Sequence, residues 1–252
     1  MPVGWPARPA DHTNASALAL LLVLGPGCGL SRLSLPVVPP LLKAPGAAVL
    51  WHEPFEQLDA DRWRAVEVEG QTDYLVVDLE GRRCLMANSR GGASILLAGF
   101  RFDPQMYRWL SWEWRVDQLV EAEALQEKRG SDAAARVYVY FDSKGLPWQR
   151  HNIDYVWSAT LPVGTILNSA FSSASKIIVA ESGTHHLGQW RTVTRHLERD
   201  YELCFGKEPP DVLAIGVMTD TDNTGGSALA YFDELHISRT APRGRPGSAG
   251  ED

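Results

Sequence analysis

The chain has 252 residues, of which 44% are hydrophobic and 22% are charged, and its net charge is -7. This length and composition suit one domain of the sandwich or barrel type with a sizeable apolar core. The charges alternate in sign without a basic stripe, which argues against a nucleic-acid partner, and the three cysteines form no C-x-x-C motif of a zinc or redox site.

The N-terminal region resembles a signal sequence. Its apolar run from Ala17 to Leu24 is too short to span a bilayer but has the length of a signal h-region, and Arg8 precedes it. Cys28 follows the run and could carry a lipid, although Gly25 occupies the place where lipoprotein signals have an aliphatic residue. We therefore expect export to the periplasm or cell envelope, against the alternative of a disordered extension with a chance apolar run.

The rest of the chain divides by composition, and no segment in it is a transmembrane candidate. A proline-rich stretch follows the leader, a long run of strands comes next, and the polar C-terminus is typical of a disordered tail. The expected organisation is a leader at 1–28, a linker at 29–48, a sandwich domain at 49–238 and a tail at 239–252.

The middle of the chain predicts many short strands. Ten segments have the period of two and the length of strands, and turn sequences such as "EGRR" and "DSKG" separate many of them. They are 74–79, 83–87, 94–100, 109–116, 136–142, 153–159, 176–182, 190–197, 212–219 and 228–237. The pattern predicts an all-β fold, an antiparallel β-sandwich of jelly-roll or galactose-binding-like type.

One or two short helices are expected beside the strands. Residues 197–206 read as a helix that ends at Gly206, and residues 118–130 as a short helix or an exposed excursion. Cys84 and Cys204 both lie among apolar residues, so buried thiols are favoured over a disulfide between them.

Two predicted strands combine aromatic and charged residues on one face. Period two places Trp112 and Val139 on core faces, and the opposite faces carry a mixed set of side chains. That set is Trp109, Glu113, Arg115, Arg136, Tyr138 and Asp142. Either it is a solvated face with cross-strand ion pairs, or it lines one groove in which the aromatics stack on a ring and the charges bind hydroxyls.

Several blocks resemble a known family. "DAAARVYVYFD" (132–142), "LGQW" (187–190), "VMTDTDNTG" (217–225) and "AYFDELHIS" (230–238) are similar to the bacterial domain-of-unknown-function family DUF3047, over roughly residues 50 to 238. The resemblance implies a bacterial, often exported protein and brings no activity with it. The closing "YFDELHI" is also similar to the last strand of galactose-binding-like, carbohydrate-binding sandwiches.

The segment "DTDNTG" (220–225) is the most polar stretch between strands. It begins like a calcium loop, but position 12 of an EF-hand would hold Tyr231 instead of glutamate. Three interpretations stay open: a looser calcium site of Asp220, Asp222 and Asp233, a sugar-contacting loop that also uses Asn223, and an Asx-type turn.

Three functions remain compatible with the sequence. The first is a non-enzymatic envelope protein that binds a glycan or a similar polar ligand. The second is a glycan-active hydrolase or lyase, for which Glu113 and Asp142 could form a carboxylate pair if their strands are neighbours. The third is a structural envelope protein without a small ligand. We favour binding over catalysis, because no nucleophile motif is present.

Overall fold

The computed structural model describes residues 47–143 and 150–242. The predicted leader, nearly all of the predicted linker and most of the predicted tail lie outside these residues. The first strand begins at Val49 and the last ends at Ser238. No helix in the described ranges is long and apolar enough to cross a membrane.

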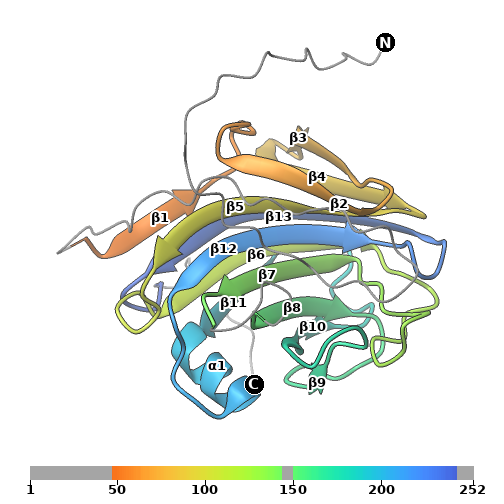
Figure 1. Ribbon diagram of the computed structural model, residues 1–252. Coiled ribbons are helices and arrows are strands. Elements are labelled where there is room, and N and C mark those ends of the chain that lie inside the picture. Colours follow the sequence, from red (N-terminus) through yellow and green to blue (C-terminus); the bar gives the residue numbers. More distant parts are fainter. Residues whose placement is uncertain (1–46, 144–149, 243–252) are drawn as a thin grey trace, which may run out of the picture.

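Two sheets make up the molecule (Figure 1). The six-stranded sheet has the order β11-β6-β13-β4-β3, and β1 also pairs with β13. Its strands are β1 (Val49–Glu53), β3 (Asp73–Leu79), β4 (Arg82–Arg90), β6 (Trp109–Gln118), β11 (Arg191–His196) and β13 (Ser227–Ser238). The seven-stranded sheet has the order β2-β5-β12-β7-β8-β10-β9. Its strands are β2 (Trp63–Glu69), β5 (Ala93–Phe102), β7 (Ala135–Phe141), β8 (Asn152–Ser158), β9 (Ile166–Asn168), β10 (Ser175–Ser182) and β12 (Val212–Asp220).

The predicted β-sandwich is confirmed, and each of the ten predicted strands is present. Strands β1, β2 and β9 were not predicted. Strand β2 is a largely exposed edge strand, and β9 has only three residues, so neither carries a strong apolar alternation. The sheets are also not wholly antiparallel, because β8 and β10 pair in parallel. The long connection between them makes this crossover possible.

The core between the sheets is built from tryptophans and other large apolar residues. Trp112 and Trp114 of β6 pack edge to face, with ring centroids 5.3 Å apart. Trp112 meets Tyr155 of the other sheet at 5.4 Å, and Trp114 meets Trp157 at 5.9 Å. All four side chains are fully buried, so these rings join the two sheets across the core.

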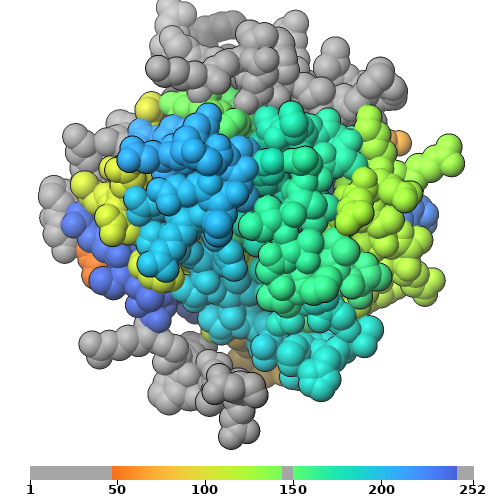
Figure 2. All heavy atoms as spheres, turned by 90° about the horizontal axis from the view of Figure 1, so that it is seen from below, coloured from red at the N-terminus to blue at the C-terminus, as the bar shows by residue number. Residues whose placement is uncertain are grey.

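The predicted helix at 197–206 is confirmed as α1 (Leu197–Phe205). Gly206 ends it in the left-handed conformation, with φ of 67°, and its amide donates to the Glu202 carbonyl. Viewed from below, α1 lies beside the β9–β10 region (Figure 2). Phe205 of α1 contacts the seven-stranded sheet, because the ring of His151, just before β8, stacks on it at 3.9 Å and Nζ of Lys176 on β10 lies 5.9 Å from its centroid.

Gln118 ends β6, and residues 119–130 form a loop instead of the second helix expected at 118–130. Val120, Glu123 and Leu125 are buried in it. The Glu123 carboxylate accepts hydrogen bonds from the Ser158 hydroxyl and from the amide of Ala159. These long-range bonds hold the loop against the end of β8 and override its local helical propensity.

Cys84 and Cys204 are free and buried, as the sequence suggested. Burial raises the pKa of each thiol to about 11. Cys28 lies outside the described residues.

Candidate functional site

The face assignment of the two mixed strands is confirmed. Trp112 and Val139 are fully buried in the core, whereas Trp109 and Tyr138 are partly exposed on the outer faces. The prediction that both outer faces line one groove is wrong. Strand β6 belongs to the six-stranded sheet and β7 to the seven-stranded sheet, and both turn their apolar residues toward the shared core. Their outer faces therefore lie on opposite sides of the sandwich.

This arrangement divides the predicted ligand residues. Trp109, Glu113 and Arg115 lie on the outer face of the six-stranded sheet, called here the six-strand face. Arg136 and Tyr138 lie on the outer face of the seven-stranded sheet, called here the seven-strand face. Asp142 follows β7 at the end of the strand opposite to Arg136, and it forms ion pairs with Arg101 and Arg150.

The charges of the six-strand face pair with one another. The Arg82 guanidinium lies 2.5 Å from both Glu113 and Asp233 and stacks on the Trp190 ring, 4.0 Å from its centroid. Arg115 donates to Asp117 at 2.6 Å. These are cross-strand ion pairs, as one of the two interpretations expected, but Arg82, Glu113 and Asp233 are only 24%, 14% and 4% exposed and so are partly or fully buried. Each charged group of this set has a counter-charge.

The seven-strand face has a buried ion cluster at its centre. The Nε of Arg136 donates to Asp220 at 2.7 Å, and its Nη1 donates to Asp154 on β8. All three side chains are at most 5% exposed. Burial disfavours the charge of Arg136, but the two carboxylates outweigh it and hold the guanidinium pKa well above its ordinary value.

Two polar atoms of this face lack a hydrogen bond. Within the described residues, the Tyr140 hydroxyl and Oδ1 of Asp154 are buried and make no hydrogen bond of good geometry, although the Tyr138 side chain also favours the charged form of Asp154. The rings of Tyr138 and Tyr140 stack with centroids 5.7 Å apart. Burial and then the Asp154 charge raise the pKa of Tyr140, so the phenol stays protonated beside the carboxylate. Buried polar atoms are normally satisfied, so a water molecule or a ligand hydroxyl is the natural partner for this pair.

A cluster of apolar side chains packs beside Tyr138 and Tyr140 on the seven-strand face. Ile95, Leu97 and Met218 are buried there, although they point away from the core between the sheets. Gly216 makes their packing possible, because a Cβ at this position would lie 2.6 Å from Leu97 Cδ2. This part of the seven-strand face is thus packed as tightly as a core.

The acidic segment 220–225 connects β12 to β13 and hence one sheet to the other. The prediction that Asp233 joins Asp220 and Asp222 is wrong, because Asp233 is paired with Arg82 on the six-strand face. Asp132, which precedes β7, takes its place: one carboxylate oxygen from each of Asp132, Asp220 and Asp222 lies within 4.8 Å of the others.

Asp132 organises this segment as a turn. Its carboxylate accepts hydrogen bonds from the backbone amides of Asn223 and Thr224 and from the Asn223 side chain, at 2.7 to 3.2 Å. Burial raises the pKa of Asp220 to about 7 and that of Asp222 to about 6, and the neighbouring Asp132 adds to both shifts. The three carboxylates could hold a hard cation, and the hydrogen bonds to Asp132 equally suit an Asx-type turn.

Two other sequence candidates do not form a catalytic pair. Glu113 and Asp142 belong to different sheets, so the predicted neighbouring carboxylates do not occur. Glu181, near the end of β10, accepts a hydrogen bond from Arg191 at 3.0 Å and lies 3.5 Å from His186, so it is paired with a cation.

Sequence reasoning missed Asp132, Tyr140 and Asp154 as members of this site. Asp132 lies immediately before a predicted strand, and Tyr140 shares the face of Arg136 and Tyr138, so both carried a signal. No local pattern indicated Asp154 beyond its position in a predicted strand, because only sheet pairing brings it next to Arg136.

The fold and these faces define a two-sheet β-sandwich with a polar, aromatic outer face. The chain belongs to the family "Protein of unknown function (DUF3047)", whose model matches residues 61–236. No curated protein matches the chain.

The solved structures similar to this chain include carbohydrate-binding modules. The family 30 module of a cellulosomal cellulase of Clostridium thermocellum is 12% identical and covers 75% of this chain and 97% of its own, with a TM-score of 0.43. The CBM22-1 xylan-binding domain of Paenibacillus barcinonensis Xyn10C is 12% identical, covers 78% and 96%, and has a TM-score of 0.36. The xyloglucanase domain of NopAA from Sinorhizobium fredii is 11% identical, covers 73% and 96%, and has a TM-score of 0.38. Likeness at this level does not transfer a ligand, so the function is argued from the site itself.

Proposed function

We propose that this protein binds a polar, hydroxyl-rich ligand, of which a glycan is the leading class, on the seven-strand face. One observation carries the proposal. The Tyr140 hydroxyl and Oδ1 of Asp154 are buried without a partner among the described residues, next to the stacked rings of Tyr138 and Tyr140.

The chemistry of this group matches a sugar. A sugar hydroxyl both donates and accepts, so it can satisfy a carboxylate oxygen and a phenol at once. An aromatic ring supplies a flat apolar surface for the carbon face of a sugar ring. Tyr138 is partly exposed and offers the point of first contact. The Arg136–Asp154 ion pair fixes the position of the carboxylate before any ligand arrives.

Binding is a better proposal than catalysis. A glycosidase needs two carboxyl groups on either side of one bond, about 5 to 10 Å apart and within reach of the substrate. On the seven-strand face, Asp154 and Asp220 are both tied to Arg136 and almost fully buried. Their task in the proposal is to orient a ligand, and no proton transfer is assigned to them.

The proposed place of action is the periplasm or cell envelope. The apolar run from Ala17 to Leu24 and the proline-rich stretch after it support export. Residues 1 to 45 fused to a reporter that is active only outside the cytoplasm should give signal. A fusion that stays cytoplasmic would refute export, and an unmodified Cys28 on the mature protein would refute lipidation.

A glycan array probed with the full chain tests the binding proposal. Tyr138→Ala and Asp154→Asn should each weaken binding to the best glycan by more than about tenfold, as loss of an aromatic or charged anchor commonly does. Trp109→Ala, on the six-strand face, is the matched control and should bind like the wild type. Loss of binding in Trp109→Ala alone would move the site to the other sheet, and no binding to any glycan would refute the ligand class.

A further inference from the structure

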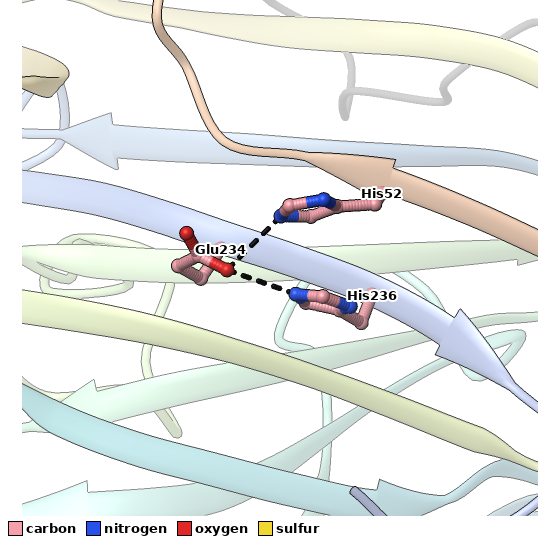
Figure 3. A group of neighbouring side chains, drawn as sticks. All are labelled: His52, Glu234 and His236. Carbon is pink, nitrogen blue, oxygen red and sulfur yellow. Dashed lines mark hydrogen bonds and ion pairs between the residues drawn. The ribbon is translucent and has the colours of Figure 1, made fainter. Parts of the chain in front are cut away.

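A second cluster of side chains lies on the six-strand face, on the side of the sandwich opposite to the proposed ligand site. His52 of β1 pairs directly across from His236 of β13, and Glu234 precedes His236 by two residues. The two imidazole rings stack at 3.9 Å, and both direct Nε2 toward the same carboxylate oxygen of Glu234 (Figure 3). The distances to that oxygen are 3.0 Å from His52 and 2.9 Å from His236.

A β-bulge creates this convergence. Phe232, Leu235 and Ile237 of β13 all point into the core, so the usual alternation gains one residue between Phe232 and Leu235. The pairing of β13 with β6 shifts at the same place, and Glu234 has a φ of 51°. Regular pairing would have sent Glu234 into the core, and the bulge turns it outward to the histidines instead.

The strained backbone is supported locally. The amide of Glu234 donates to the carboxylate of the preceding Asp233 at 2.8 Å. The left-handed conformation is unfavourable for a non-glycine residue and persists where the surroundings hold it, often at functional sites. The bulge in β13 and its local hydrogen bond therefore hold Glu234 beside the histidines of β1 and β13.

We propose that His52, Glu234 and His236 bind a divalent transition-metal ion, with Zn²⁺ as the reference ion. Two imidazoles and one carboxylate suit zinc and its first-row neighbours, whereas calcium and magnesium prefer oxygen alone. With metal–ligand bonds of about 2.0–2.2 Å, neighbouring ligand atoms of a tetrahedral ion lie roughly 3.3–3.6 Å apart. The two Nε2–Oε2 distances are shorter than this by roughly 0.3–0.7 Å. The metal therefore enters when the three side chains move apart and the stacked rings turn toward it.

The site is open to solvent. The side chains of His52, Glu234 and His236 are 39%, 27% and 28% exposed. Three protein ligands leave a fourth position of a tetrahedral ion for water or for an external group. A bound ion would also link β1, which pairs only with β13 among the described strands, more firmly to the sheet.

Zinc titration by calorimetry tests this proposal, with the full chain freed of metal by chelation and without a histidine tag. The wild type should bind one equivalent of Zn²⁺ at this site. His236→Gln and Glu234→Gln should each weaken it by about 100-fold or more, since even groups that only support a ligand contribute about 10–100-fold. Bound Co²⁺ should give visible bands typical of nitrogen and oxygen ligands, and these bands should disappear in both variants.

The double variant His185→Gln with His186→Gln is the matched control. These histidines also lie close together, with ring centroids 4.7 Å apart, and His186 also contacts a glutamate. The control should bind zinc like the wild type. His52→Gln, at the most exposed of the three ligands, gives a second test if His236→Gln does not fold. Unchanged zinc binding in the ligand variants, or its loss in the control alone, would overturn the proposal.

Discussion

The outer faces of the two sheets carry similar residues in different environments. On the six-strand face, Arg115 is 12% exposed and pairs with Asp117 and Glu80, which are 26% and 70% exposed. On the seven-strand face, Arg136 serves Asp154 and Asp220 with all three groups at most 5% exposed. Alternating aromatic and charged residues therefore produce ion pairs with partly exposed partners around Arg115 on one sheet and a nearly dry polar cluster around Arg136 on the other.

This difference in burial indicates which face is the better candidate for a ligand site. An ion pair in contact with solvent contributes little to stability, and water can satisfy its remaining polar atoms. A buried cluster costs desolvation energy, and every unmatched atom in it costs more. The unpartnered atoms of Tyr140 and Asp154 therefore make the seven-strand face the better ligand site, whereas the six-strand face offers its histidine cluster alone.

The largest expected effect comes from removing the buried cation. Arg136→Met leaves two buried carboxylates without a counter-charge and should lower the free energy of unfolding by about 3–5 kcal/mol. Arg115→Met on the six-strand face is the matched control and should cost about 1 kcal/mol or less. Urea denaturation at neutral pH measures both. Equal losses of unfolding free energy in the two variants would mean that the Arg136 cluster depends on its cation no more than the Arg115 pair does.

A smaller effect is expected from filling the space at Gly216. Gly216→Ala brings a methyl group to within 2.6 Å of Leu97 and 2.9 Å of Ile95, so it should cost about 1–3 kcal/mol. Leu97→Val in the same chain should recover part of the loss, because it makes room for the new methyl group. An unchanged denaturation midpoint for Gly216→Ala would show that this outer face is not packed like a core.

The pH dependence of stability offers a third test. Burial raises the pKa of Asp220 from 3.8 to about 7, so the folded state binds more protons than the unfolded state between these values. Stability should therefore fall as the pH rises from about 4 to about 7, by up to about 1.4 kcal/mol per pH unit for one group. Asp220→Asn should flatten this decline when unfolding is measured in the presence of a chelator. The same slope in the variant and the wild type would contradict the burial of an ionisable Asp220.

Calcium should have the smallest effect. If the carboxylates of Asp132, Asp220 and Asp222 hold Ca²⁺ with a Kd of about 1 mM, 10 mM calcium would stabilise the fold by about 1.4 kcal/mol. The melting temperature should then rise by a few degrees, and Asp222→Asn should remove the rise. Identical melting curves with calcium and with chelator would leave this segment as a turn between the sheets.

The local features of the fold could be predicted from the amino-acid sequence. Period two in ten segments predicted the strands, and it assigned Trp112 and Val139 to the core, because alternation follows from backbone geometry alone. The end of α1 at Gly206 was equally local, since glycine adopts the left-handed conformation without strain. The acidic stretch at 220–225 could also be recognised as a polar connection between strands, because Asp, Asn and Gly residues are typical of turns.

Which strands share a sheet depends on long-range pairing, so it became visible only in the tertiary structure. Nothing in the periodicity of β6 and β7 indicates that their outer faces lie on opposite sides, and the predicted common groove fails for that reason. Long-range pairing likewise brings Asp132 to Asp220, Asp154 to Arg136 and His52 to His236, across separations that local patterns do not encode. Strand partners are chosen by burial of the whole core, so the composition of each candidate site became visible only once the sheets were assembled.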